Sequence, residues 1–306
     1  MDRTSMGMVA MLFVVLGIAQ LMFGTDRTTS RPEQRQFIDP DGLSRRAMAE
    51  LPQSSSAGLI LSVDIQRPAF LAQRRGGVTD DELRPLRHLN DVESLFMGFN
   101  PITDTGLAHI AHLTRMKTLG LAGTAITDDG LSHLAGMHDL ENLILEFTTI
   151  SDEGLKEVAK LPRLQSLSMM DTNVRGSGLQ HLADHTALEE LGLSGTGVTS
   201  EDLRWLRNNT ALRDISLANT RIDDRAAEHL AAMTSLRYLK LEGTTIGDDT
   251  IAAIAALPHL EELNIVGTRV TSRSEPILRQ MPSLQLLHSW DTELGDLSLG
   301  PSDTAW

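Results

Sequence analysis

The stretch Leu140–Leu161, LENLILEFTTISDEGLKEVAKL, is one copy of a pattern that recurs every 24 residues. Three columns of like residues carry this repeat through the chain. One column is Val92, Met116, Leu140, Leu164, Leu188, Leu212, Leu236, Leu260 and Leu284, a second runs three residues later from Leu95 to Leu287, and a third is threonine from Thr124 to Thr292. An uninterrupted period in the twenties predicts a solenoid, in which each unit packs only on its neighbours.

Within one unit, the spacing of apolar residues changes from that of a strand to that of a helix. Leu143 and Leu145 alternate with their neighbours, as in a strand. After Asp152 the apolar residues are spaced as in a short helix. The residues in the column of Asp152 are all suited to cap a helix N-terminus, and they are Asp80, Asp104, Asp128, Asp152, Gly176, Ser200, Asp224, Asp248 and Ser272.

Stacking such units predicts a curved α/β array. Neighbouring strands lie ~4.8 Å apart, whereas packed helices need ~10 Å. The units must therefore fan out, with a parallel sheet on the concave face and short helices on the convex face.

The repeated pattern LxxLxLxxTxITDxGLxxLxxL, as in Met116–Met137, resembles the leucine-rich repeat family in its 24-residue, helix-bearing form common in bacterial proteins. The resemblance covers residues 68–294, about ten units. It implies a right-handed βα horseshoe that serves as a non-catalytic binding scaffold. The chain departs from the family at the turn, where asparagine occurs only at Asn100 and threonine replaces it later. A threonine hydroxyl can still satisfy buried backbone groups, with fewer hydrogen bonds.

An apolar run precedes the repeats. Residues 6–23 contain Gln20 as the single polar side chain and as a helix would extend ~27 Å, close to a bilayer core of ~30 Å. We expect residues 1–24 to be a signal-anchor transmembrane helix. The alternatives are a cleaved signal peptide and a buried soluble helix.

Two features of the sequence give opposite predictions for the orientation of this span. The arginines after it, at Arg27, Arg31 and Arg35, would retain the repeats in the cytoplasm, whereas the five-residue N-terminal tail favours export. We expect a single-pass membrane protein with its repeats on the extracytoplasmic side. Residues 25–57 form a polar linker with a possible short helix, 58–67 a capping strand and 295–306 a frayed C-terminal tail.

Composition argues against several classes of function. A net charge of −14 disfavours nucleic acid as a partner. The absence of cysteine excludes disulfides and thiolate chemistry. Neither a P-loop nor a nucleophile elbow occurs, and no cofactor or metal is expected. The histidine column on the convex helices is interpreted as a solvated face, and its members are His109, His133, His181 and His229.

The concave face holds the candidate binding residues, at strand positions that flank the inward leucines. Towards the C-terminus they are Tyr238, Lys240, Glu242, Asn264, His288 and Trp290. Exposed aromatic residues among charges are typical of a protein-binding hot spot, although Trp290 could instead cover the end of the core. A second cluster comprises Phe96, Ile144, Glu146 and Met170, with Phe99 and Phe147 either joining it or packing in the turn.

The sequence thus predicts a monomeric, membrane-anchored scaffold that binds a protein or peptide on its concave sheet. One alternative is a structural spacer at the cell envelope. Another is an enzyme resembling a glycan hydrolase, which would need two carboxylates ~5–10 Å apart. Glu146 and Glu242, four strands apart, would be separated by ~19 Å.

Overall fold

The computed structural model describes residues 69–70 and 77–299. Of the two units into which the chain divides, Met1–Gly42 and Leu43–Trp306, only the second contains described residues. The expected membrane span, linker and capping strand, residues 6–23, 25–57 and 58–67, lie outside them. Within residues 69–70 and 77–299, every helix is too short or too polar to cross a bilayer.

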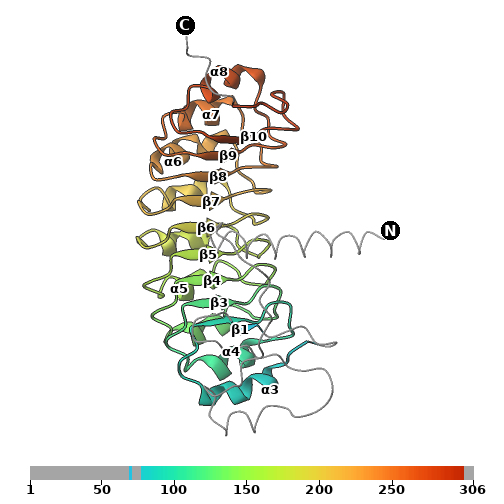
Figure 1. Ribbon diagram of the computed structural model, residues 1–306, viewed down its shortest axis with the longest axis vertical. Helices are drawn as coiled ribbons and strands as arrows, with labels where there is room; N and C mark the ends of the chain where they lie inside the picture. The colour runs from blue at the N-terminus through green and yellow to red at the C-terminus, as the bar shows by residue number, and fades with distance from the viewer. Residues whose placement is uncertain (1–68, 71–76, 300–306) are drawn as a thin grey trace, which may run out of the picture. The chain divides into compact units, whose positions relative to one another are not determined.

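The strands form one parallel sheet in the order in which they occur in the chain (Figure 1). They are β1 Ala69–Phe70, β2 Ser94–Phe96, β3 Thr118–Gly120, β4 Asn142–Ile144, β5 Ser166–Ser168, β6 Glu190–Gly192, β7 Asp214–Ser216, β8 Tyr238–Lys240, β9 Glu262–Asn264 and β10 Leu286–His288. From β2 onwards each residue pairs with the residue 24 positions later, so Leu119 lies between Leu95 and Leu143. In the first unit, the residue opposite Leu95 is Ala69, 26 positions earlier, so that unit is two residues longer.

A short helical segment follows the strand in most units. The α-helices are α3 Asp80–Leu83, α4 Asp104–Ile110, α5 Leu155–Val158, α6 Ala227–Ala232, α7 Asp248–Ile254 and α8 Glu275–Leu278. The 3-10 helices are η1 Arg84–His88, η2 Gly130–Leu134, η3 Ser177–Leu182, η4 Ser200–Trp205, η5 Asp224–Ala226 and η6 Ser272–Ser274. With only one or two turns available in each unit, the tighter i→i+3 pattern competes well with the α-helix.

The core lies between the sheet and the helices, which line opposite sides of the stack (Figure 1). The repeat columns fill it, and the unit around β4 contributes Leu140, Leu143, Leu145, Ile150, Leu155, Val158 and Leu161, all buried. Each such side chain contributes about 1.5–3 kcal/mol when removed from water. The alternation predicted for Leu143 and Leu145 is therefore confirmed.

The turn after each strand is held by the threonine column. Thr148 donates its hydroxyl to the carbonyl of Leu145 at 2.6 Å, and the equivalent threonines do the same in their own units. Asn100, the single asparagine of this column, makes three bonds, donating to Met97 and Gly98 and accepting from Val78. The expected substitution of threonine for asparagine, with fewer hydrogen bonds, is confirmed.

A left-handed backbone conformation immediately precedes the threonine column. Glycine occupies this position in some units, whereas Phe99 (φ 59°) and Phe147 (φ 55°) adopt the strained conformation. Their ring centroids lie 6.4 Å apart across Gly123. A Cβ atom at Gly123 would approach the Phe99 ring to 2.5 Å, so the absent side chain makes room for the pair. Phe99 and Phe147 therefore pack in the turn.

The aspartate column does not cap its own helices, which corrects the sequence interpretation. The helix α4 is capped by Thr103, whose hydroxyl accepts from the N–H of Thr105. The Asp104 carboxylate at the next position instead accepts from the N–H and hydroxyl of Thr127 in the following unit, at 2.8 and 2.7 Å. Asp80, Asp128, Asp152, Asp224 and Asp248 accept bonds from the following unit in the same way. These six carboxylates, here called the aspartate ladder, join consecutive units.

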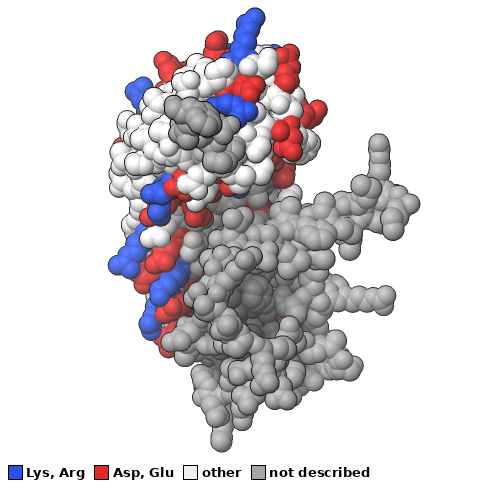
Figure 2. Space-filling view, turned by 45° about the horizontal axis from the view of Figure 1, so that its top comes forward, with Lys and Arg blue, Asp and Glu red and all other residues white. Residues whose placement is uncertain are grey.

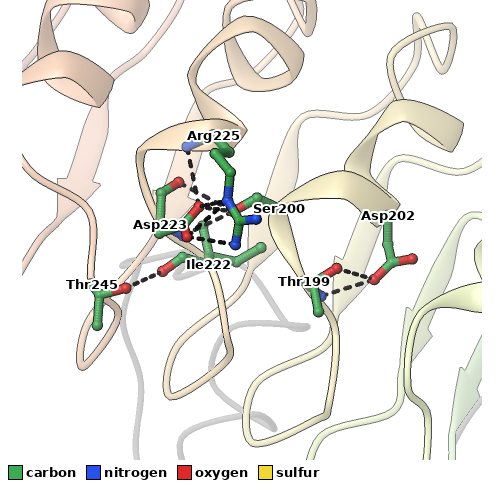
Figure 3. A network of polar contacts seen from close by, with 7 residues as sticks. All are labelled: Thr199, Ser200, Asp202, Ile222, Asp223, Arg225 and Thr245. Atoms are coloured by element: carbon green, nitrogen blue, oxygen red, sulfur yellow. Dashed lines mark hydrogen bonds and ion pairs between the residues drawn. The ribbon is translucent and has the colours of Figure 1, made fainter.

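The ladder changes where the column holds Gly176 and Ser200, and Figure 3 shows Ser200 beside Asp223. Thr199 and Asp202 form a capping box within their own unit, in which the Asp202 carboxylate accepts from the N–H of Thr199. The same carboxylate occupies the space that a side chain at Gly176 would need. Between the next two units the polarity is reversed, because Ser200 supplies the hydroxyl and Asp223 supplies the carboxylate. Hydrogen bonds from Arg225, together with that from Ser200, lower the pKa of Asp223 to about 2.

The C-terminal end of the stack is closed by residues expected to form a frayed tail. Leu297 and Leu299 pack against the core beside Leu294. The Ser289 hydroxyl donates to the carbonyl of Gly295 at 2.7 Å and accepts from the N–H of Leu297 at 3.2 Å. The expectation of a tail that begins at residue 295 is therefore wrong for residues 295–299, because the last unit needs an apolar cover.

Candidate protein-binding face of the sheet

Each strand presents three side chains on the side of the sheet turned away from the core, here called the sheet face. They belong to the first and last residues of the strand and to the residue two positions beyond it. On β8 to β10 these side chains are Tyr238, Lys240 and Glu242, then Glu262, Asn264 and Val266, then Leu286, His288 and Trp290. The six residues predicted from the C-terminal half all lie in this block, which brings them together on three adjacent strands.

Three large apolar side chains of this block are exposed. Tyr238 is 37% exposed, Leu286 46% and Trp290 59%, and no other large hydrophobic residue is exposed within residues 77–299. Trp290 therefore does not cover the end of the core, which is the role of Leu294, Leu297 and Leu299. Solvent-exposed aromatic and aliphatic groups gathered on one face mark an interaction surface.

The polar side chains between them are held by one another. The Asn264 amide donates to the Glu242 carboxylate and accepts from the N–H of Val266. The Nε2 atom of His288 lies 3.6 Å from a carboxylate oxygen of Glu262. The Asn264–Glu242 and His288–Glu262 contacts join neighbouring units, and Tyr238, Leu286 and Trp290 remain exposed beside them.

A line of carboxylates leads into this block. The first residue of each strand is here called the leading strand position. It is Glu190, Asp214 and Glu262 in β6, β7 and β9, and Tyr238 and Leu286 in β8 and β10. Burial raises the pKa of Asp214 to about 6; Lys240 opposes this rise, whereas Glu190 and Glu262 add to it. The site is therefore acidic, with one carboxylate that titrates near neutral pH.

The second predicted cluster is less accessible than expected. Phe96 and Met170 are half-buried, whereas Ile144 is 7% exposed and Glu146 only 2%. The Glu146 carboxylate accepts from the Ser168 hydroxyl at 2.7 Å, and burial raises its pKa despite this bond. Outward direction on a pleated strand does not ensure contact with solvent. The prediction that Ile144 and Glu146 form an exposed surface is wrong.

The convex histidines show no arrangement suited to a metal. No group of three or more metal-binding side chains occurs in the part of the chain that the structure describes. The expected solvated face is wrong for His229, which is buried at 7% exposure. His185 and Asn209 hydrogen-bond to the carbonyls of Leu161 and Leu182, at 2.8 and 3.3 Å.

Comparison with known proteins bears on this architecture. A family model described as Leucine Rich repeat matches residues 232–255, the segment that spans β8 and α7. The crystal structure of internalin C2 from Listeria monocytogenes superposes with a TM-score of 0.55 at 21% identity, over 70% of this chain and 84% of that chain. The chain has the fold of a leucine-rich repeat protein.

A second structural match spans a larger protein. The mouse RP105/MD-1 complex contains a chain that superposes with a TM-score of 0.54 at 19% identity, over 68% of this chain and 35% of that chain. At such identities the likeness concerns the fold alone. No curated protein sequence matches the chain.

One residue of the exposed block was not predicted from the sequence. Leu286 occupies the leading strand position, which holds polar residues or tyrosine in the preceding units from β2 onwards. An aliphatic residue in an otherwise polar outward column was the available signal.

Proposed function

We propose that this protein is a non-catalytic scaffold that binds a protein or peptide on the sheet face over β8–β10. The observation that carries the proposal is the gathering of three exposed apolar side chains on one face: Tyr238 on β8, and Leu286 and Trp290 in the β10 unit two strands away. Buried on binding, such side chains provide the anchors of protein interfaces, with charged neighbours at the rim.

The similarity in fold supports a protein partner. The RP105 structure is that of a complex with MD-1, so a stack of this architecture holds another protein in that case. We further propose that residues 6–23 anchor the scaffold to a membrane and that the repeats lie on the extracytoplasmic side. This rests on the apolar run in the sequence.

The enzymatic alternative is less well supported by the geometry. Glu242 is bonded to Asn264, and Glu146 is buried and bonded to Ser168, so these two acids do not face one another across an open site. A structural spacer would give no reason for three exposed apolar side chains on one face. We therefore favour binding over both alternatives.

The proposal is tested by photocrosslinking in the native cell. A photoreactive amino acid replaces Lys240, which lies within the block, and crosslinked proteins are identified by mass spectrometry. A specific band should appear and should vanish when Tyr238→Ala is combined with Trp290→Ala. The matched control places the same amino acid at Lys156 on the convex side and should give no such band. A band that survives the double substitution would refute the proposed surface.

A further inference from the structure

The order of side chains along the leading strand position is informative about the partner. From β6 to β10 this position reads Glu190, Asp214, Tyr238, Glu262 and Leu286. Two acids therefore precede an apolar group, and a third acid separates that group from another. Neighbouring strands are ~4.8 Å apart, so the alternation has the scale of successive side-chain contacts on a bound segment.

The neighbouring arginines do not pair with these acids. Arg213 and Arg237, which precede β7 and β8, pair with Glu189 and Glu261 instead. Those ion pairs lie beside the leading column rather than in it. On the sheet face of β6–β10, the cationic side chains are therefore Lys240 and, when protonated, His288.

Four carboxylates share the face with these two groups. Lys240 interacts with Asp214, and His288 lies near Glu262. Glu242 is held by the neutral amide of Asn264, and no ion pair of Glu190 is found within the described residues. Apolar anchors and unneutralised negative charge thus occupy the same three to five strands.

We propose that the partner presents a basic segment to β6–β10, with lysine or arginine side chains placed beside aliphatic or aromatic ones. This inference rests on the proposed binding function and specifies its chemistry. Cations of the partner lie against Glu190, Asp214 and Glu262, and its apolar side chains cover Tyr238, Leu286 and Trp290. Two features of the molecule favour this occupant over an acidic or purely apolar one.

The first feature is charge complementarity. The chain has a net charge of −14, and in the view of Figure 2 Asp and Glu side chains crowd the right-hand margin of the end that faces the viewer, with few Lys or Arg among them. Such a field attracts a basic segment and repels an acidic one. The second is the short distance between acid and apolar groups, which lets a lysine stem lie on Tyr238 or Leu286 while its ammonium reaches Glu262.

The test uses the full-length protein and three fluorescein-labelled peptides of equal length. The first alternates lysine and leucine, the second alternates glutamate and leucine, and the third alternates lysine and glycine. Binding is measured by fluorescence anisotropy at about 0.05 M and about 0.5 M salt. The lysine–leucine peptide should bind most tightly, should weaken at high salt, and should weaken tenfold or more when Glu190→Gln, Asp214→Asn and Glu262→Gln are combined.

A control variant removes the same charges elsewhere. Asp81→Asn, Glu153→Gln and Glu201→Gln alter exposed acids of the helical side and should change affinity less than twofold. Equal loss in both variants, or equal affinity for the glutamate–leucine peptide, would overturn the inference. Circular dichroism of each variant confirms that it folds. If the crosslinked band depends on Tyr238 and Trp290 but not on the three acids, the proposed function stands and the basic partner does not.

Discussion

The hydroxyl of Ser200 donates to the carboxylate of Asp223 at 2.7 Å, which is the reverse of the arrangement in most other units. Elsewhere the earlier unit supplies aspartate and the later unit supplies threonine, serine or backbone N–H groups. The bond between units is thus retained while donor and acceptor exchange sides. The residues of this column therefore serve the contact between units rather than the capping of a helix within one unit.

Exchanging the two residues should therefore preserve the contact. Ser200→Asp alone brings two carboxylates together, and Asp223→Ser alone pairs two hydroxyls, so both should lower the free energy of unfolding. The double substitution restores the usual polarity and should recover about 0.5–3 kcal/mol relative to the sum of the single effects. Urea unfolding of the four proteins measures this coupling; additive effects would show that the exchange of roles has no energetic basis.

Removal of one ladder carboxylate should destabilise the stack locally. Asp128 accepts from the N–H and the hydroxyl of Ser151, at 2.8 and 2.6 Å. Asp128→Ala should lower the free energy of unfolding by about 1–3 kcal/mol, the usual cost of losing bonds to a charged group. The neighbouring Asp129 lies at the same helix N-terminus without a side-chain bond there, so Asp129→Ala should change stability by less than about 0.5 kcal/mol.

The half-buried carboxylate of Asp214 should make stability depend on pH. Its pKa in the folded state is about 6, above the ordinary 3.8, so the folded protein binds this proton more tightly than the unfolded chain. The free energy of unfolding should therefore rise as pH falls from about 7 to about 4. Asp214→Asn should stabilise the protein at pH 7 by about 1–3 kcal/mol and have little effect at pH 4. Equal effects of the substitution at both pH values would contradict the raised pKa.

Asp223 should behave in the opposite way. Its pKa of about 2 means that its stabilising contribution is complete above pH 4 and is lost as pH falls through 2. Arg225→Ala removes the main donor and should move the pKa upwards towards 3.8. Carboxyl carbon chemical shifts followed by NMR between about pH 1.5 and pH 6 measure the change directly. An unaltered midpoint would show that Arg225 does not hold this carboxylate.

The left-handed turn predicts different costs for two similar substitutions. Gly123 and Gly267 have φ of 63° and 65°, but a Cβ atom at Gly267 meets nothing closer than 3.7 Å, whereas at Gly123 it meets the Phe99 ring at 2.5 Å. Gly267→Ala should cost about 1 kcal/mol for the backbone alone. Gly123→Ala should cost about 1–3 kcal/mol more through overpacking. Combining it with Phe99→Ala should relieve this excess, and thermal unfolding provides the comparison.

Much of the fold was predictable because the chain repeats the same local information. The inward leucines, the turn threonines and the strand-to-helix change in spacing recur in register, so an error in one unit is corrected by the others. The helix type was less predictable, since one or two turns leave α and 3-10 conformations close in energy. The packing of Leu297 and Leu299 was missed because no repeat pattern extends to them.

Of the candidate site, too, one part was predictable from the sequence and another part was not. The alternation of the strand identified the direction of Tyr238, Glu146 and Trp290 correctly, but not their exposure. Tyr238 and Trp290 are exposed, whereas Glu146 is buried beside Ser168 of the next strand. Direction is a property of one strand, and exposure depends on the side chains of several strands together.

The sequence by itself determined the stacking of the units, because the 24-residue period of apolar residues allows only neighbouring units to bury one another's leucines. Tertiary structure alone decided which carboxylate bonds to which hydroxyl, and which outward side chains meet water. Asp104 bonds to Thr127 rather than to its own helix, and Ile144 is covered while Leu286 is not. Hydrogen-bond partners and solvent contact depend on distances between units, which the pattern within one unit does not contain.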